Sequence, residues 1–259
     1  MPSELLSTRE GRALVLTISD PATRNALSPQ VYTAAVEALN MAEGAADIAC
    51  VIFTGAGAHF SAGGDLQRIR GLRAQGPQAQ ADSMALFHTL IESLRAFPKP
   101  VIAAVEGHAA GGGMSLALAC DLIVAADDAR FSMAYGRVGL SPDGAGTWHL
   151  ARALPRALAL EILWLGGTVD AARLQALGVV NRLTHKGGAR LEAIALAEQL
   201  AQRAANALAS AKELVGRAPQ AALGPHLADE QRHFIQNLFH DNGAEGLQAF
   251  FEKRPPAFR

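Results

Sequence analysis

Charged and aromatic side chains are scarce in this sequence. Of its 259 residues, 18% are Asp, Glu, Lys or Arg and 5% are Phe, Trp or Tyr. The 23 basic and 24 acidic residues give a formal net charge of −1. A chain this close to neutrality has no broad basic surface, so we expect neither a nucleic acid nor a membrane surface as a partner. Intrinsic disorder is excluded too, because 50% of the residues are hydrophobic.

Cysteines and long apolar segments are also few. The two cysteines, Cys50 and Cys120, each lie in an apolar run, which is typical of buried free thiols in a reducing compartment. The N-terminal residues mix acidic and basic side chains and lack the apolar stretch of a signal peptide. The longest apolar region, residues 101–126, is interrupted by Glu106, a glycine cluster and Asp121, so it cannot span a bilayer. We therefore expect a cytoplasmic protein.

Glycine and alanine are abundant instead, and the apolar segments alternate between strand-like and helix-like patterns. Such alternation predicts an α/β fold with a parallel or mixed sheet. The expected strands cover residues 5–8, 13–19, 49–54, 101–105, 122–125 and 179–183, and the expected helices begin at Pro29, near Asp65, at residue 82 and at Gly111. Because helical segments dominate the later part of the chain, we expect an α/β core over residues 1–185 and a helical C-terminal region over residues 186–259.

The glycine clusters do not have the spacing of nucleotide-binding loops. A GxGxxG pattern that begins at Gly55 would need glycine where Phe60 stands, and one that begins at Gly144 meets His149 instead. The phosphate-binding pattern GxxxxGK[ST] is absent from the sequence. These spacings exclude the usual dinucleotide-binding and P-loop motifs.

A serine hydrolase is one alternative that the sequence leaves open. The segment Gly113-Met-Ser115 resembles a relaxed nucleophile elbow, and Asp143 and His149 follow it in the order of a Ser-Asp-His triad. Two features weigh against this interpretation. The second small residue of the elbow is Ala117 rather than glycine, and the acid and base of a triad normally come from separate loops, whereas these two are close in sequence.

No residue pattern predicts a metal site. The histidines His226, His233 and His240 recur every seven residues, whereas two ligands on one helix need a spacing of three or four. We expect these histidines to lie on a solvent-exposed helix face.

Two glycine-rich loops, each after an expected strand, form a stronger pattern. The first is GAHFSAGGDL over residues 57–66, and the second is VEGHAAGGGM over residues 105–114, which opens a helix. Free N–H groups at the start of a helix, on residues without a Cβ, can bind an oxyanion. If each loop aims one N–H at the same carbonyl oxygen, the pair forms an oxyanion hole. Tight turns and helix–strand packing would explain either loop taken alone equally well.

With several other segments, these loops resemble the crotonase (enoyl-CoA hydratase/isomerase) superfamily along essentially the whole chain. The matching segments are PATRNAL (21–27), IFTGAG (52–57), FSAGGDL (60–66), KPVIAAVEG (99–107), GGG (111–113), ACDL (119–122), GLSPDGAGT (139–147) and FFEKRP (250–255). The resemblance implies a spiral of ββα units followed by helices that mediate trimer formation, in a homotrimer or homohexamer. It also implies an acyl-CoA thioester as the ligand, with no cofactor apart from the coenzyme A of the substrate.

The resemblance also assigns site residues. It implies that the thioester carbonyl lies between the backbone N–H groups of Gly64 and Gly112. The positions that it places along the substrate and its coenzyme A are Arg24, Ala26, Ala62, Gly64, Asp65, Leu66, Gly112, Ser115, Tyr135 and Lys253, the last of these near the phosphates. Met114, Met133 and Trp148 would line the acyl pocket, although packing in the core would explain them equally well.

The catalytic carboxylates of the family's hydratases are replaced here. Those enzymes carry one glutamate two residues after the triple glycine and another in the segment after the next strand, where this chain has Ser115 and Tyr135. Neither side chain can serve readily as a base near neutral pH, so the usual paired acid–base addition of water loses both partners.

Asp143 remains at a catalytic position, and it resembles the single aspartate of the family's ring-epoxide and double-bond isomerases. The resemblance therefore implies isomerisation of an acyl-CoA, by a double-bond shift or a rearrangement, with Asp143 as the proton carrier. Asp143 would equally suit the N-cap of a helix beginning near Gly144. The other functions that the sequence leaves open are a hydratase with substituted catalytic residues, a non-catalytic acyl-CoA-binding protein and the serine hydrolase that would use Ser115.

Overall fold

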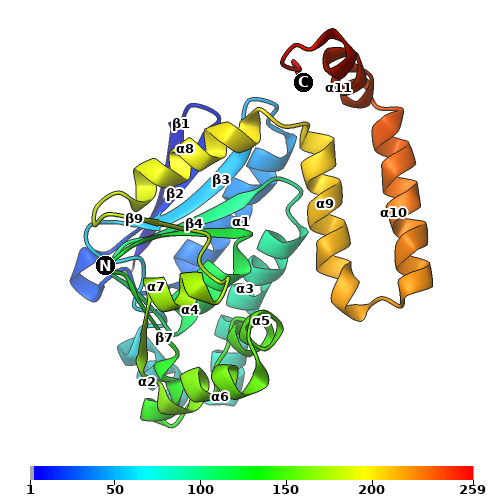
Figure 1. Ribbon diagram of the computed structural model, residues 1–259. Helices are drawn as coiled ribbons and strands as arrows, with labels where there is room; N and C mark the ends of the chain where they lie inside the picture. The colour runs from blue at the N-terminus through cyan, green and yellow to red at the C-terminus, as the bar shows by residue number, and fades with distance from the viewer. Residues whose placement is uncertain (1–2, 259) are drawn as a thin grey trace.

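The computed structural model describes residues 3–258, and its centre is a sheet of six strands (Figure 1). The first two strands, β1 (Glu4–Glu10) and β2 (Ala13–Ser19), form an antiparallel hairpin. All later neighbours in the order β1-β2-β3-β4-β6-β9 pair in parallel. These later strands are β3 (Cys50–Gly55), β4 (Val101–Val105), β6 (Leu122–Ala126) and β9 (Arg182–Thr184). The predicted α/β fold is confirmed.

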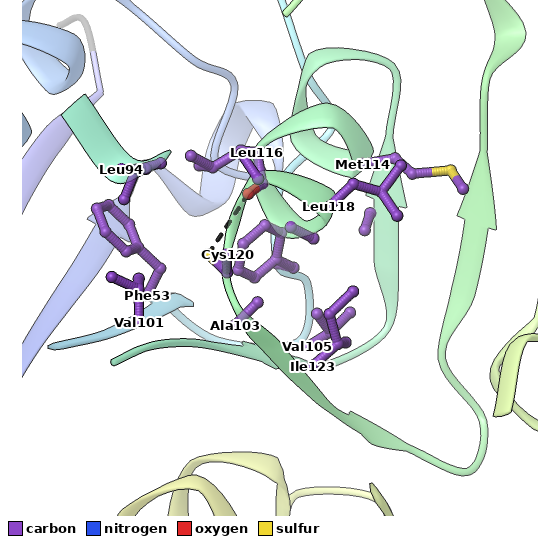
Figure 2. Packing of buried hydrophobic residues seen from close by; sticks show 14 of the residues in the cluster. Phe53, Leu94, Val101, Ala103, Val105, Met114, Leu116, Leu118, Cys120 and Ile123 are labelled. Carbon is purple, nitrogen blue, oxygen red and sulfur yellow. Dashed lines mark hydrogen bonds between the residues drawn. The ribbon is translucent and has the colours of Figure 1, made fainter. Parts of the chain in front are cut away.

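Helices cover both faces of this sheet, which explains why its strands are continuous apolar runs in the sequence. On one face lie α1 (Pro29–Gly44), α3 (Pro77–Ala96) and α4 (Gly112–Ala119), and on the other lies α8 (Ala189–Ala201). Alternate residues of a strand point to opposite faces. Val101 and Val105 of β4 therefore join the core beneath α4, as Figure 2 shows, whereas Ile102 packs on the side of α8.

A smaller sheet lies beyond the carboxyl end of β4. It consists of β5 (His108–Ala110), β7 (Arg130–Ser132) and β8 (Thr168–Asp170), with β7 in the middle. A strand of three residues is too short to show the alternation of apolar and polar residues in the sequence. The predicted strands therefore do not include those of this sheet. β5 leads directly into α4, so this sheet fixes the second glycine-rich loop in place.

The other helices lie around this framework and at the C-terminal end. They are α2 (Leu66–Gln75), α5 (Gly146–Ala153), α6 (Arg156–Leu165), α7 (Ala171–Ala176), α9 (Ala205–Arg217), α10 (Leu223–Leu238) and α11 (Asp241–Glu252), with 3-10 turns η1 (Pro21–Thr23), η2 (Ala134–Val138) and η3 (Ala218–Gln220). Figure 1 shows α9, α10 and α11 extending away from the sheet. The division of the chain at residue 185 stays a prediction. Among residues 3–258, no helix combines the length and the apolar character needed to cross a membrane.

The predicted element boundaries agree with the structure in most places. Ser28 is the N-cap of α1, as expected, and its hydroxyl accepts a hydrogen bond from Val31 N at 3.3 Å. The strand expected over residues 179–183 is shorter and later in the structure, because Val179 instead donates to the carbonyl of Leu174 in the turn after α7.

The expectation of a solvent-exposed histidine face on the C-terminal helices is wrong. His233 is buried, and its Nδ1 lies 3.0 Å from the hydroxyl of Ser210 on α9. His240 is the N-cap of α11, and its Nδ1 accepts a hydrogen bond from Asn242 N. Both histidines therefore have structural roles between or at the ends of helices.

Phe53 on β3 offers a direct test of this core, because its side chain is fully buried beside Leu94 and Val101 (Figure 2). Phe53→Ala should lower the free energy of unfolding by about 3–5 kcal/mol, through lost burial and the cavity left behind. Urea unfolding followed by circular dichroism measures this change. The control is Met41→Ala on the exposed face of α1, which should change stability by less than about 0.5 kcal/mol. Equal effects of the two substitutions would contradict the described packing.

Candidate active site

The two glycine-rich loops lie side by side because they follow neighbouring parallel strands. The first follows β3 and the second follows β4, and the carboxyl ends of parallel strands meet at one edge of a sheet. Ser61 N donates a hydrogen bond to His108 O at 3.0 Å, and Ala110 N donates to Ser61 O at 2.9 Å. This short parallel bridge joins the loops just before their glycine clusters.

The side chain of Ser61 adds a second set of contacts. It is fully buried, donates to the carbonyl of Asn25 at 2.8 Å and accepts from Gly63 N at 3.1 Å. Gly63 has a φ of 84°, and a Cβ there would lie 2.4 Å from Ala110 O and 2.9 Å from Gly112 N. The two loops therefore approach so closely that only glycine fits at residue 63.

This approach leaves two backbone N–H groups without partners. Within residues 3–258, neither the N–H of Gly64 nor that of Gly112 donates a hydrogen bond. Gly112 is buried and is the first residue of α4, where the N–H groups have no intrahelical acceptor. A buried N–H without a partner is costly, and the positive end of the helix dipole lies at the same point. The pair is suited to hold an oxygen atom that carries negative charge.

A carboxylate lies in the same region, on the loop before α5. The hydroxyl of Tyr135, which belongs to η2, donates a short hydrogen bond to Oδ1 of Asp143. Among the described residues, Oδ2 of Asp143 has no hydrogen-bond partner. The hydroxyl of Ser115 on α4 donates to the main-chain carbonyl of Asp143 at 2.9 Å. Two side chains therefore fix the aspartate and leave one carboxylate oxygen available.

The environment keeps Tyr135 in its neutral form. Burial raises the pKa of the Tyr135 hydroxyl well above its usual range, and the negative charge of Asp143 raises it further. Tyr135 is thus a hydrogen-bond donor to Asp143 and not a base. The alternative role of Asp143 as a helix cap is wrong, because α5 begins at Gly146 with Ala145 as its N-cap and no side-chain cap.

Gly64, Gly112 and Asp143 all line one cavity of about 170 Å³. It is lined by Tyr32, Ala62, Gly64, Leu66, Arg68, Ile69, Gln80, Ser83, Met84, Phe87, Ala110, Gly111, Gly112, Ala134, Tyr135, Val138, Leu140 and Asp143. The structure thus brings together six predicted site residues, namely Ala62, Gly64, Leu66, Gly112, Tyr135 and Asp143. Apart from Leu66, the sequence does not mark the lining residues of α1, α2 and α3, since no local motif shows which of their side chains face inward.

Most of the residues predicted to lie along the coenzyme A are near the first glycine-rich loop, whereas Lys253 is not. Arg24 and Ala26 border the first glycine-rich loop, because Ala62 N donates to Arg24 O at 2.9 Å. Asp65 is the N-cap of α2, and its Oδ1 accepts from Gln67 N at 2.8 Å. Lys253 ends α11, which Figure 1 shows at the far end of the molecule from α2. Within one chain the structure does not bring Lys253 to this site.

Other expected arrangements are not formed. Ser115 bonds to the backbone of Asp143, and His149 Nε2 is buried without a partner, so no Ser-Asp-His relay exists among these residues. Burial lowers the pKa of His149 to about 4, and the positive charges of Arg95 and Arg152 add to the effect.

The expected acyl-pocket lining also needs correction. Met114 and Met133 are fully buried in the core rather than in the cavity lining. Trp148 lines a different cavity, between α3, α5 and α9, where the guanidinium of Arg152 lies 3.7 Å from its ring centroid. The directions of Met114 and Trp148 follow from where α4 and α5 begin, which the sequence pattern does not fix.

Known proteins resemble this chain over nearly its whole length. A model of the family described as enoyl-CoA hydratase/isomerase matches residues 8–259. The crystal structure of an enoyl-CoA hydratase from Polaromonas sp. JS666 has a TM-score of 0.98 and 54% sequence identity, and the match covers 99% of this chain and 100% of that one. A 2,3-dehydroadipyl-CoA hydratase of Escherichia coli (strain K12) is 33% identical over 99% of both chains. A 1,2-epoxyphenylacetyl-CoA isomerase of the same strain is 33% identical over 98% of this chain and 97% of that one.

The contrast between Gly63 and Gly112 tests the contact between the loops. Gly63→Ala should lower the free energy of unfolding by at least about 1 kcal/mol, because its φ is positive and its Cβ would overlap Ala110 O. Gly112→Ala should be neutral or stabilising, since its Cβ would lie 3.4 Å from Leu27 and helical backbone favours alanine. Urea unfolding of both variants gives the comparison. A Gly63→Ala protein as stable as Gly112→Ala would contradict the described approach of the loops.

Proposed function

Because the chain belongs to the enoyl-CoA hydratase/isomerase family, we propose that it isomerises an acyl-CoA thioester with Asp143 as the proton carrier. One observation carries the proposal: among the described residues that line the cavity, Asp143 is the one carboxylate, and Gly64 and Gly112, whose N–H groups have no partner, line the same cavity. This combination supports proton transfer next to a stabilised carbonyl oxygen.

The two N–H groups stabilise the intermediate. The thioester carbonyl oxygen of the substrate accepts hydrogen bonds from Gly64 N and Gly112 N. When a proton leaves the neighbouring carbon, the oxygen becomes an enolate oxygen and its negative charge grows. Donors fixed in advance strengthen as this charge develops, and removing one typically costs about 10²–10³ in rate.

Asp143 moves the proton. For a 3-enoyl thioester, Oδ2 of Asp143 removes a proton from C2, and the electron pair passes into the carbonyl. The same proton then returns to C4, so that the double bond shifts from C3–C4 to C2–C3. Asp143 ends the cycle ionised, as it began, and no water or cofactor is consumed.

Tyr135 and Ser115 position this aspartate. They occupy the places where the resemblance puts the two glutamates of the family's hydratases, and in this chain both bond to Asp143. Tyr135 holds Oδ1, which leaves Oδ2 as the oxygen that exchanges the proton. With serine and tyrosine in place of the two glutamates, this site has a single carboxylate, which the two side chains hold in position.

Hydration of a 2-enoyl thioester is the second candidate, since two of the relatives above are named as hydratases. In that reaction Asp143 and Tyr135 would together activate the water. Incubation with crotonyl-CoA separates the two reactions, because hydration removes the enone absorbance whereas the proposed isomerase leaves it in place.

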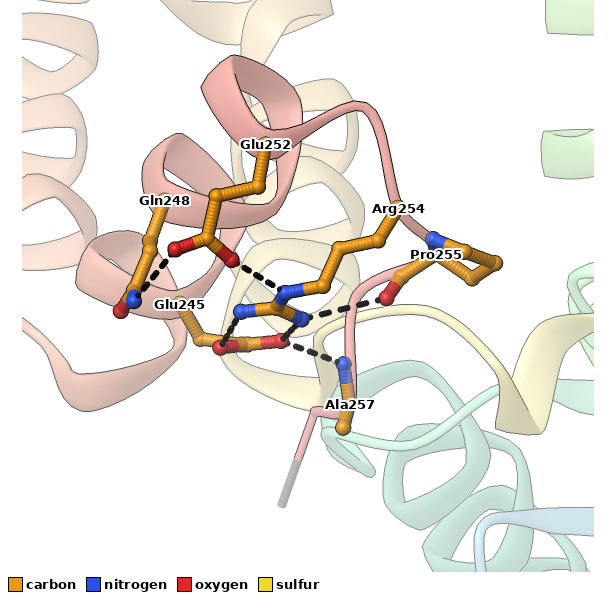
Figure 3. Close-up of polar contacts among 6 residues, drawn as sticks. All are labelled: Glu245, Gln248, Glu252, Arg254, Pro255 and Ala257. Carbon is orange, nitrogen blue, oxygen red and sulfur yellow. Dashed lines mark hydrogen bonds and ion pairs between the residues drawn. The ribbon is translucent and has the colours of Figure 1, made fainter.

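We further propose a homotrimer or homohexamer in the cytoplasm that acts on a coenzyme A ester without another cofactor. The C-terminal helices carry exposed aromatic residues: Phe239, directly after α10, is 83% exposed in the single chain, and Phe250 on α11 is 77% exposed. After α11, the guanidinium of Arg254 pairs with Glu245 and Glu252, so the chain end folds back on this helix (Figure 3). A rigid extension with an apolar surface of this kind fits a subunit interface, where Lys253 would reach the site of a neighbour.

Asp143→Asn tests the catalytic assignment. The amide keeps the size of the side chain but cannot accept a proton, so kcat for 3-enoyl-CoA isomerisation should fall by about 10²–10⁴. Absorbance of the conjugated product measures the rate. Asp170→Asn is the matched control, because Asp170 caps α7 on the surface and asparagine caps a helix equally well. A wild-type rate in Asp143→Asn would refute the role of Asp143, and a wild-type protein that binds but never converts enoyl esters would be a non-catalytic binder.

Light scattering tests the assembly. The wild-type protein should have three or six times the chain mass of 27.1 kDa. Phe239→Glu should shift the mass toward a single chain, because a charge buried at an interface is costly. Glutamate at the exposed Met41 of α1 is the control and should leave the mass unchanged. A wild-type mass of one chain would rule out this assembly.

A further inference from the structure

One wall of the cavity is more polar than an acyl chain requires. Pockets for acyl groups are mostly apolar, with a few polar groups that fix orientation. In addition to the groups assigned above, Arg68 of α2 and Gln80 and Ser83 of α3 line the cavity. None of these three has a part in the proposed proton transfer.

Arg68 lines this wall as a cation without an acidic partner. Its Nη1 donates to the hydroxyl of Ser83 at 2.6 Å, which fixes the guanidinium between the two helices. Its Nε is buried and has no hydrogen-bond partner. Within residues 3–258, no carboxylate forms an ion pair with Arg68. A partly buried guanidinium of this kind gains from an anionic ligand, because its planar donors match a carboxylate.

Gln80 has a second unused polar atom on the same wall. Its Oε1 is buried without a partner. The last torsion of a glutamine side chain has two broad minima, so rotation by about 180° exchanges the oxygen for the NH2 group. In that orientation Gln80 presents a second donor beside Arg68. A ligand atom that reached this wall would give a partner to Arg68 Nε and to Gln80, which have none among the described residues.

The positive charge of Arg68 and the negative charge of Asp143 act on the same cavity. Tyr32 lines the cavity, and burial raises the pKa of its hydroxyl most, while the charge of Arg68 lowers this pKa and that of Asp143 raises it. Asp143 would repel a second carboxylate beside the thioester, whereas Arg68 would attract one. An anionic group of the substrate is therefore directed to the α2–α3 wall.

We propose that Arg68, supported by Ser83 and Gln80, binds a carboxylate at the far end of the acyl group, so that the substrate is a coenzyme A monothioester of a short dicarboxylic acid. The inference rests on the proposed function, since it defines the substrate of the same site. A cavity of about 150 Å³ holds benzene, so the cavity of about 170 Å³ has room for an acyl group of roughly six carbon atoms.

Binding of unreactive saturated thioesters tests this proposal independently of turnover. Adipyl-CoA and hexanoyl-CoA have the same chain length and differ in a terminal carboxylate or methyl group. By isothermal titration calorimetry, the wild-type protein should bind adipyl-CoA about 10–100-fold more tightly, as expected for hydrogen bonds to a charged group. Arg68→Met should abolish this preference and leave the Kd of hexanoyl-CoA within about threefold, which also shows that the variant folds.

Two further variants show whether the guanidinium of Arg68 itself causes the preference for adipyl-CoA. Arg68→Lys keeps the charge but loses the paired donors and should retain part of the preference. Arg70→Met removes a cation from the same helix at an exposed position outside the cavity lining, so the full preference should remain. Equal wild-type affinities for the two esters, a preference that survives in Arg68→Met, or no binding of either ester would overturn the proposal. A preference for adipyl-CoA with no isomerisation of any enoyl ester would support Arg68 and refute the proposed function instead.

Discussion

The backbone contact between two glycine-rich loops is the constraint on which the candidate site depends. Ser61 bonds through its main chain to the strand before α4 and through its side chain to Asn25 and Gly63. These bonds bring Gly63 so close to Ala110 and Gly112 that a Cβ on Gly63 would overlap their backbone. The N–H groups of Gly64 and Gly112 consequently face one cavity without partners. A sheet whose parallel strands end at a common edge makes this possible, since each loop starts from a buried strand.

A second constraint fixes the carboxylate. Asp143 lies on a loop that contacts α4 through Ser115 and η2 through Tyr135. Because both side chains bond to the same residue, the loop cannot move without breaking two hydrogen bonds near the core. The arrangement explains how a site with a single carboxylate can be ordered although both positions of the family's paired glutamates are substituted. Burial supports this arrangement, because Ser115 is fully buried and burial keeps the hydroxyl of Tyr135 protonated.

The strand pattern and the glycine loops could be predicted from the sequence because both depend on local composition. The strand expected over residues 101–105 has those bounds in the structure, since all its side chains are buried and apolar. Arg68, by contrast, could not be predicted as a cavity residue, because its place depends on how α2 packs against α3. Trp148 was assigned to the wrong cavity for a similar reason, since the left-handed residue Ala145 sets where α5 begins and which way its side chains point.

The proposed mechanism requires one geometry: a single thioester oxygen is held by two backbone N–H groups, and Asp143 lies beside the carbon that loses the proton. A crystal structure of the Asp143→Asn protein with a bound 3-enoyl-CoA measures it directly. The carbonyl oxygen should lie about 2.7–3.1 Å from both Gly64 N and Gly112 N, with C2 of the acyl group next to residue 143. A carbonyl oxygen bound by neither N–H group, or an acyl chain outside this cavity, would contradict the account.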